Sequence, residues 1–363
     1  MKKQILAVVC AAALLVTGCT TAAPSSSSSS VSESSSSSSS SAAESTAPVL
    51  PESSSSVAEP VAPAERISLK IAALKGPSAI GLLPLMEHKA DTANNYDFTM
   101  AGAPDQLVGS IIKGEFDIAV LPTNLAATVF NKTEGKVRLA TINTLGVLYL
   151  VETGDSVQSI ADLKGKTIYS SGKGATPEYA LNFVLQQNGL TPGTDVTVEY
   201  RTEHTEIATL MASGEATLAL LPQPFVTTVL MQNDKARVAI DLTKAWEALP
   251  GEVGTLAMSG MVVQQKLIDE HPEALAAFLD EYKVATEYIT TPANLDAAAE
   301  LAVQYEVIPK AAIAKKAIPQ CNIVFLAGAE MKTAAEGFLK TLFAANPKSV
   351  GGKLPDETFY YIP

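Results

Sequence analysis

Short apolar runs and amphipathic stretches alternate along residues 66–363. Apolar runs rich in β-branched and aliphatic residues predict strands over Ile67–Leu74, Tyr96–Met100 and Phe116–Leu121. The spacing between these runs predicts two helices, one from about Ala79 to Lys89 and one from an N-cap at Asp105 to Lys113. The region therefore begins with the strand–helix alternation that is typical of an α/β fold.

The same order of elements returns further along the chain. The pattern predicts, in turn, a strand, a helix, a strand, a helix and a strand over Lys166–Tyr169, Pro177–Asn188, Val196–Tyr200, Glu206–Ala212 and Thr217–Leu221. Strands that alternate with helices favour parallel sheets with right-handed crossovers. Ligands of such sheets bind at the carboxyl ends of the strands, so we look for a site in the loops that follow them.

One segment of the first pass is repeated in the second. The stretch Ile112–Pro122 returns as Ala212–Pro222, with Gly, Glu, Ala, Leu and Pro in the same register. Two such copies predict an α/β fold of two doubly wound lobes with a ligand cleft between them. Two further apolar runs, Leu139–Val151 and Thr255–Val263, are expected to be the crossover segments that join the lobes.

The remainder of the chain is helical in pattern. Apolar side chains recur at helical spacing over Pro272–Thr290, Leu295–Tyr305 and Met331–Leu342, which places these stripes in the core. We therefore expect a monomeric head over residues 66–363, with lobe one over about 66–148 plus 260–363 and lobe two over about 149–259.

Residues 1–19 predict an export signal. Lys2 and Lys3 precede an apolar run over Ile5–Val16 that is too short to cross a bilayer. The sequence that follows, through Gly18 to Cys19, resembles the lipobox of bacterial lipoproteins, which implies cleavage before Cys19 and a diacylglyceryl anchor on its sulfur. Plain secretion with an incidental cysteine is the alternative.

Residues 20–65 predict a disordered tether. Long serine runs followed by Pro, Ala and Glu leave too few large apolar side chains for a core. The tether would hold the head away from the outer face of the cell membrane. A glycosylated stalk is the alternative.

Charge and composition exclude several kinds of function. A net charge of −12 disfavours nucleic acid as a partner, because phosphate binding needs clustered Lys and Arg. With Cys19 lipidated, Cys321 has no partner for a disulfide. His88, His204 and His271 lie far apart and form no zinc-binding motif, so neither a metal nor a cofactor is expected. No motif of a catalytic nucleophile is found, so no catalytic residue is assigned.

Two loops that open predicted helices are candidates for solute binding. One is Lys75-Gly76-Pro77-Ser78, and the other contains Ser171, Gly172, Lys173, Gly174, Ala175 and Thr176. The second loop has the glycine spacing of a dinucleotide-binding motif, but Pro177 stands where that motif has Gly or Ala. Backbone N–H groups at helix N-termini, near Lys75 and Lys173, predict a clamp for an anion or an acceptor oxygen. Two ordinary helix starts are the alternative.

Residues at the other strand ends extend this candidate site: Ala103, Thr123, Asn124, Arg201 and Gln223. Arg201 is the only arginine at a predicted strand end, where it would hold a carboxylate or sulfonate through two hydrogen bonds. A solvated surface arginine is the alternative. Tyr149 is expected on the floor of the cleft, whereas Trp246, the only tryptophan, is expected to pack in the core. Stacking of Trp246 on a ring-bearing ligand is the alternative.

These features together resemble a known family. The lipobox, the serine-rich tether, the segment Ser159–Ile168 after the crossover and the repeated strand–loop–helix plan are similar to type II periplasmic-type solute-binding proteins of ABC importers. Within these, the likeness is to the nitrate/sulfonate/taurine and thiamine-precursor group. The resemblance implies a receptor that closes on a small organic anion or a nitrogen heterocycle and delivers it to a membrane permease. An enzyme on the same fold is the alternative, namely a chorismate dehydratase-like lyase with Asp105, Glu203 or His204 as acid or base.

Overall fold

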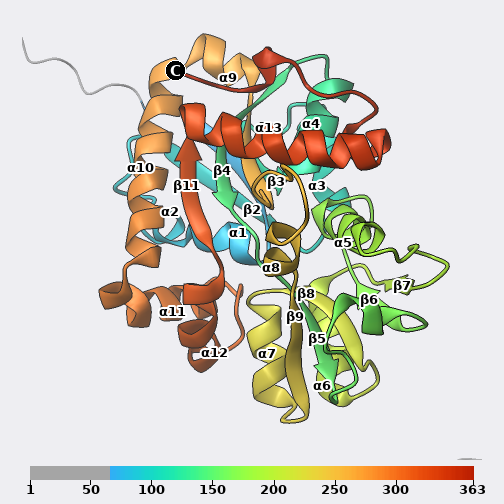
Figure 1. Ribbon diagram of the computed structural model, residues 1–363. Coiled ribbons are helices and arrows are strands. Elements are labelled where there is room, and N and C mark those ends of the chain that lie inside the picture. The colour runs from blue at the N-terminus through green and yellow to red at the C-terminus, as the bar shows by residue number, and fades with distance from the viewer. Residues whose placement is uncertain (1–65) are drawn as a thin grey trace, which may run out of the picture. The chain divides into compact units, whose positions relative to one another are not determined.

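Two β-sheets organise the part of the chain that the computed structural model describes, residues 66–363 (Figure 1). The predicted signal peptide, the lipidation site Cys19 and the tether over 20–65 lie outside the described residues. The two sheets, each combined with helices, confirm the predicted α/β fold of two lobes. None of the helices in residues 66–363 has the length and apolar character needed to traverse a bilayer.

Lobe one is built on a six-stranded sheet in the order β11-β4-β10-β3-β1-β2. Its strands are β1 (Ser68–Leu74), β2 (Asn95–Ala101), β3 (Ile118–Pro122), β4 (Val137–Thr144), β10 (Ser259–Gln264) and β11 (Ile323–Ala327). β1 pairs in parallel with β2 and β3, but β10 is antiparallel to β3 and β4, and β11 is antiparallel to β4. The predicted parallel pairing therefore holds for β1, β2 and β3, whereas β10 and β11 make the sheet mixed. β10 re-enters this sheet from lobe two, so no βαβ crossover sets its direction.

Lobe two is built on a five-stranded sheet in the order β7-β6-β8-β5-β9. Its strands are β5 (Leu148–Thr153), β6 (Thr167–Ser170), β7 (Thr197–Tyr200), β8 (Leu218–Pro222) and β9 (Ala236–Asp241). β6 is parallel to β7 and β8, and β5 is antiparallel to β8 and β9. The strands of the repeated segment, β3 and β8, are thus each paired with an antiparallel strand that arrives from the other lobe.

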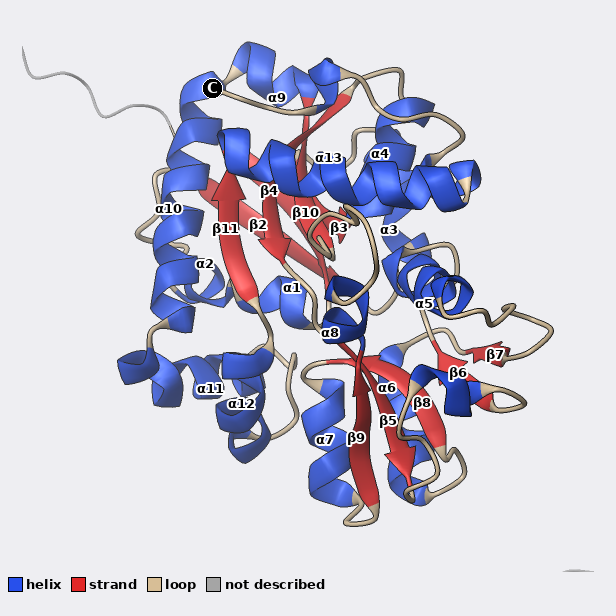
Figure 2. Cartoon of the chain, viewed as in Figure 1, coloured by secondary structure: helices blue, strands red, loops and turns tan. Residues whose placement is uncertain are grey.

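Helices cover these sheets or pack on one another (Figure 2). They are α1 (Pro77–Ile80), α2 (Leu83–Glu87), α3 (Asp105–Ile112), α4 (Thr123–Lys132), α5 (Thr176–Gln187), α6 (His204–Ser213), α7 (Phe225–Gln232), α8 (Leu242–Glu247), α9 (Gln265–Glu270), α10 (Pro272–Thr290), α11 (Leu295–Gln304), α12 (Ala311–Ala317) and α13 (Gly328–Ala345). Neighbouring residues of β1, such as Ile71 and Ala72, belong to two separate hydrophobic clusters. The first sheet is therefore buried on both faces.

Two predicted helix boundaries are wrong. The single helix expected over about Ala79 to Lys89 is two short helices, α1 and α2. Pro84 lacks the N–H that would continue the hydrogen-bonding of one helix across this point. Asp105 is the first residue of α3 rather than its N-cap, because Pro104 occupies the cap position and no side chain caps the helix. A carboxylate in the first turn is still favoured by the helix dipole.

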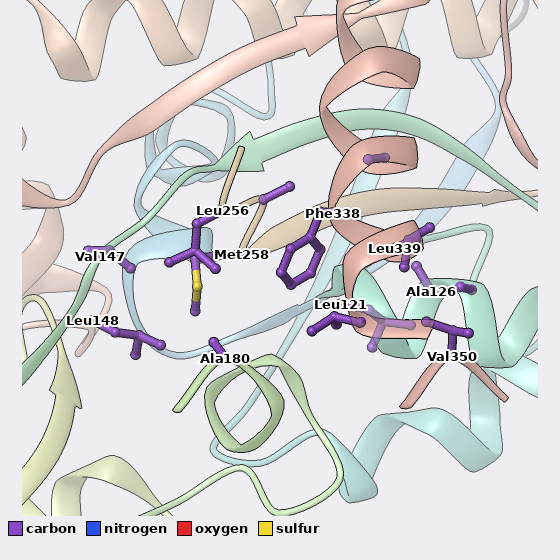
Figure 3. Packing of buried hydrophobic residues seen from close by; sticks show 14 of the residues in the cluster. Leu121, Ala126, Val147, Leu148, Ala180, Leu256, Met258, Phe338, Leu339 and Val350 are labelled. Atoms are coloured by element: carbon purple, nitrogen blue, oxygen red, sulfur yellow. The ribbon is translucent and has the colours of Figure 1, made fainter. Parts of the chain in front are cut away.

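One hydrophobic cluster is shared by both lobes. It includes Leu121 and Phe338 of lobe one, Ala180 of lobe two, and Val147 and Met258 beside the crossovers (Figure 3). Buried apolar contacts at the crossovers therefore hold the two lobes together on one side of the cleft.

Trp246 belongs to the same cluster. Its ring is fully buried, with ring centroids 5.0 Å from Phe183 of lobe two and 5.7 Å from Phe338 of lobe one. Its indole N–H donates a hydrogen bond to the Gly254 carbonyl at 3.0 Å. The expectation that Trp246 packs in the core is confirmed.

Candidate functional site

A cavity lies between the lobes where the strand ends of both sheets meet. It is lined by residues that follow β1, β2, β6 and β7 and by residues at the ends of β3, β4 and β8. Its volume, as the space open to the centres of water-sized molecules, is about 90 Å³. One water needs about 10–15 Å³ by this measure, so the cavity has room for a small solute. This is the position that the alternation of strands and helices predicted.

The lobe-one wall is formed by the loop that opens α1. Lys75, Pro77 and Ser78, three of the predicted site residues, line the cavity. Gly76 is the N-cap of α1 with φ 138°, a conformation that side chains rarely adopt. A Cβ on Gly76 would stand 3.8 Å from the ring of Phe225 in lobe two, so the two lobes approach each other closely here.

The lobe-two wall is formed by the loop that opens α5. Three predicted site residues, Ser171, Gly172 and Ala175, line the cavity together with Pro177. Within the loop, the Ala175 N–H donates to the Gly172 carbonyl at 2.9 Å and the Gly174 N–H donates to the carboxylate of Glu178. Two of the backbone N–H groups that were expected to bind an anion therefore already donate hydrogen bonds within the loop.

His204 pairs with Ser171 on this wall. The Ser171 hydroxyl and His204 Nδ1 are 2.7 Å apart, and the His204 ring lies 5.2 Å from the ring of Phe225. Packing among protein atoms lowers the pKa of His204 to about 4, although part of the residue faces the cavity. The imidazole is therefore neutral near pH 7 and adds no positive charge to the cavity.

The floor of the cavity comes from the crossovers, but its residues differ from Tyr149, which the sequence predicted there. Thr144, Val147 and Leu148 come from the first crossover, and Met258 and Ser259 from the return. Thr144 is 0 % exposed and its hydroxyl has no hydrogen-bond partner within residues 66–363. A buried hydroxyl without a partner is costly, which makes Thr144 a candidate for a solute contact.

Other predicted site residues lie in a neighbouring opening. Ala103, Lys173, Gly174 and Arg201 line it, and it shares Gly172 and Thr202 with the main cavity. Their part in solute binding stays a prediction.

The two cationic side chains of this opening already have protein partners. The Arg201 guanidinium stacks 5.1 Å from the Tyr169 ring and forms ion pairs of 3.4 Å with both Glu199 and Glu206. The Lys173 ammonium lies 5.6 Å from the Tyr200 ring. A solute in the main cavity would therefore have to draw these cations away from existing contacts.

Asn124, Thr176 and Gln223 connect the lobes instead of lining the cavity. Asn124 of α4 donates to the Gly174 carbonyl at 3.1 Å and accepts from the Thr176 hydroxyl at 3.1 Å. Gln223, at the end of β8, donates to the Gln320 side chain of lobe one at 3.2 Å. These hydrogen bonds cross the cleft and hold the two lobes against each other.

Thr123 and Tyr149 also lie away from the cavity lining. Thr123 is fully buried and its hydroxyl has no partner within residues 66–363. Tyr149 is half-buried beside Asp241 and Cys321, where burial raises the pKa of its phenol. It lies on the opposite side of β5 from Leu148, which faces the cavity.

The acid–base residues considered for the enzyme alternative have different neighbours. The Glu203 carboxylate packs directly against Gly102, Asp105 lines the neighbouring opening, and His204 is paired with Ser171. Within residues 66–363, no group of three or more His, Cys, Asp or Glu side chains is arranged to hold a metal ion.

Comparisons with known proteins agree with this geometry. Residues 81–299 match the family model of the periplasmic substrate-binding protein of phosphonate ABC transporters. No curated protein matches the chain. An ABC transporter structure from Parabacteroides distasonis is 26% identical, with a TM-score of 0.65 over 81% of this chain and 98% of the other.

Two solved sulfonate-binding proteins share the fold. The alkanesulfonate-binding protein SsuA from Xanthomonas axonopodis pv. citri, bound to MOPS, is 15% identical, with a TM-score of 0.63 over 81% of this chain and 96% of the other. The aliphatic sulphonate-binding protein SsuA from Escherichia coli is 16% identical, with a TM-score of 0.62 over 80% and 92%. The family model covers more than half of the chain, and the chain therefore belongs to the phosphonate-type family of periplasmic substrate-binding proteins of ABC transporters.

Proposed function

We propose that this protein captures a small organic oxyanion in the cavity between its lobes and hands it to the membrane permease of an ABC importer. The observation that carries the proposal is the composition of the cavity wall. Five residues that carry hydroxyl groups line it, namely Ser78, Thr144, Ser171, Thr202 and Ser259, and Lys75 is the one cationic residue among the lining residues. Hydroxyls and an ammonium group are donors for the oxygens of a phosphonate or sulfonate.

The remaining wall suits the organic part of such a solute. Leu74, Val147, Leu148 and Met258 line the cavity with apolar side chains. Binding sites for small molecules commonly combine an apolar lining with a few well-placed polar groups. An oxyanion head with a short apolar substituent would match both kinds of surface.

Closure of the lobes would supply the rest of the affinity. Micromolar binding requires about 8 kcal/mol. Contacts with both walls favour the closed state, in which Asn124 and Gln223 form their hydrogen bonds across the cleft. The permease would reopen the lobes to release the solute.

A nitrogen heterocycle is the second candidate for the solute. His204 is neutral and lies on the cavity wall beside Phe225, so it can exchange hydrogen bonds with a ring nitrogen. Stacking on Trp246 has no support, because Trp246 is fully buried in the shared core.

We further propose that the mature chain is a lipid-anchored, monomeric receptor without enzymatic activity. The lipobox-like end of residues 1–19 supports acylation of Cys19, and the serine-rich composition of residues 20–65 supports a tether. The head would comprise lobe one over about 66–148 plus 260–363 and lobe two over about 149–259. The separation of Asp105, Glu203 and His204 into different surroundings argues against a lyase.

A thermal-shift screen of the full-length chain in mild detergent tests the solute class. Methylphosphonate, ethanesulfonate, MOPS, nitrate and an aminopyrimidine are compared, with mass spectrometry of each mixture to detect turnover. A solute present at 100 times its Kd stabilises the folded state by about 2.7 kcal/mol, which raises Tm by several degrees. A shift with an oxyanion supports the proposal. A shift with only the pyrimidine, or conversion of any solute, would replace it with the second candidate or with the enzyme.

A further inference from the structure

A second space between the lobes, which we call the outer groove, lies beside the cavity. It is bounded by helices α6 and α7 of lobe two and by the segment 303–309 of lobe one. By the measure used for the cavity, its volume is about 470 Å³. Thr205 and Phe225 line it from lobe two, and Val307 and Ile308 line it from lobe one. A solute in the cavity would reach this groove only if the wall between the two spaces were open.

The wall between the cavity and the outer groove is thin. His204 lines the cavity, whereas Thr205, the next residue, lines the groove. Pro222 lines the cavity, whereas Pro224 and Phe225 line the groove. In both segments the chain passes from one space to the other within a few residues, so the two spaces are adjacent here.

The ring of Phe225 stands at this boundary. Its centroid lies 5.2 Å from that of the His204 ring, and His204 lines the cavity. A Cβ on Gly76 would lie 3.8 Å from the Phe225 ring, and the neighbours of Gly76, Lys75 and Pro77, line the cavity. Phe225 itself is half-buried and lines the outer groove. Its ring therefore lies between the outer groove and cavity-lining segments of both lobes.

The two spaces differ in charge. Within residues 66–363, Lys75 is the one cationic residue that lines the cavity, and Glu306 is the one charged residue that lines the outer groove. An anionic head is therefore favoured in the cavity and disfavoured in the groove. Ala208 and Val303 add apolar surface to the groove, which suits an alkyl tail. A long solute would accordingly place its head in the cavity and direct its tail towards Phe225.

We infer that Phe225 sets the length of the solute that the cavity accepts. With the ring in place, the tail of a bound solute ends at the wall, so the cavity holds solutes with a short tail. Without the ring, the tail would extend past His204 into the outer groove. The inference rests on the proposed function, because it assumes an anionic head in the cavity, but it adds a limit on size that the head does not determine.

The test is a calorimetric titration of the full-length chain in detergent with two pairs of solutes. One pair is ethylphosphonate and hexylphosphonate, and the other is ethanesulfonate and hexanesulfonate. The members of a pair share a head and differ only in the length of the alkyl tail. The quantity of interest is the ratio of the affinity for the long member to the affinity for the short member. Comparison of variants in the same detergent cancels any uptake of the tail by micelles.

The wild-type chain should bind the short member of a pair more tightly, because the longer tail meets the Phe225 ring. In Phe225→Ala the ratio should rise by about fourfold for each methylene group that reaches the outer groove, since each one is removed from water there. A loosened closed form would weaken both members alike, so it cancels in the ratio.

Two further variants control for a loss of packing. Phe225→Leu retains a smaller apolar side chain at the wall and should give a ratio between those of the wild-type chain and Phe225→Ala. Leu210→Ala is the matched control, because Leu210 is half-buried and packs on the same hydrophobic cluster of lobe two as Phe225, but lines neither the cavity nor the outer groove. It should lower Tm without changing the ratio.

The outcomes separate this inference from the proposed function. If the wild-type chain already binds the long member more tightly, or if the ratio in Phe225→Ala equals that in Leu210→Ala, only the role of Phe225 is refuted. If the wild-type chain binds none of the four solutes, the oxyanion function itself fails, and the inference fails with it.

Discussion

Replacement of Asn124 by alanine should loosen the closed receptor and weaken solute binding. Asn124 lies in the first turn of helix α4 of lobe one, and two of its hydrogen bonds reach lobe two, at the Gly174 carbonyl and the Thr176 hydroxyl. A third, to the Ser349 carbonyl at 2.9 Å, stays within lobe one. Only the first two depend on closure, so their loss changes the balance between the open and closed forms.

The magnitude follows from these two bonds. A neutral hydrogen bond contributes about 0.5–1.5 kcal/mol net. Loss of both bonds should therefore raise the free energy of the closed form relative to the open form by about 1–3 kcal/mol. That corresponds to an apparent Kd about 5-fold to 150-fold higher for a solute that binds only the closed form. Calorimetric titration with methylphosphonate measures the affinity, and small-angle scattering measures the closure.

Asn131→Ala is the matched control. Asn131 lies on the same helix and donates two hydrogen bonds, to the carbonyls of Val350 and Lys353, which both belong to lobe one. It should lower Tm without changing the Kd. Equal affinities for the Asn124 and Asn131 variants would refute the argument that hydrogen bonds across the cleft favour the bound state.

Three further results are expected. Packing depresses the pKa of His204 below its value in the unfolded chain, so the wild-type chain should lose stability as pH falls from about 6.5 towards about 4. His204→Gln should flatten this part of a Tm–pH profile. An unchanged slope would contradict the depressed pKa of His204. Glu152 is buried, and although burial alone would raise its pKa, hydrogen bonds from Ser156 and Val157 and the charge of Arg237 lower it. Glu152→Gln should therefore cost about 1–3 kcal/mol in urea unfolding while leaving solute affinity intact, and a loss of affinity would reveal an unrecognised link to the cleft. Cys19→Ser should abolish incorporation of labelled palmitate and release the chain from membranes in a producing cell; persistent labelling would exclude Cys19 as the anchor.

Much of the fold could be predicted because its signal is local. The repeated segment ending at Pro122 and at Pro222 marked two similar strands, and both occur, as β3 and β8. The 3.6-residue stripe of Pro272–Thr290 gave the bounds of α10. Helix α7 was missed because its short sequence is apolar on most sides, so it has no clear amphipathic period.

The candidate site was only partly predictable. Lys75 and Ser171 follow strands directly, and the general position of ligands in α/β sheets identified them. Thr144 and Ser259 are far apart in the sequence and have no motif around them. They become neighbours only because β10 returns from lobe two and pairs antiparallel with β4, and no local pattern in the sequence specifies that pairing. Asn124 was predicted to contact the solute, and its hydrogen bonds to lobe two could not be foreseen from its position after a strand.

The most direct test of the account is a crystal structure of the chain grown with whichever solute of the screening series gives the largest thermal shift. The account predicts that the solute lies between the α1 and α5 loops, within hydrogen-bond distance of Ser171 and Thr144, with the Asn124 contacts to lobe two intact. A solute bound outside this cavity, or between lobes held apart with those contacts broken, would contradict it.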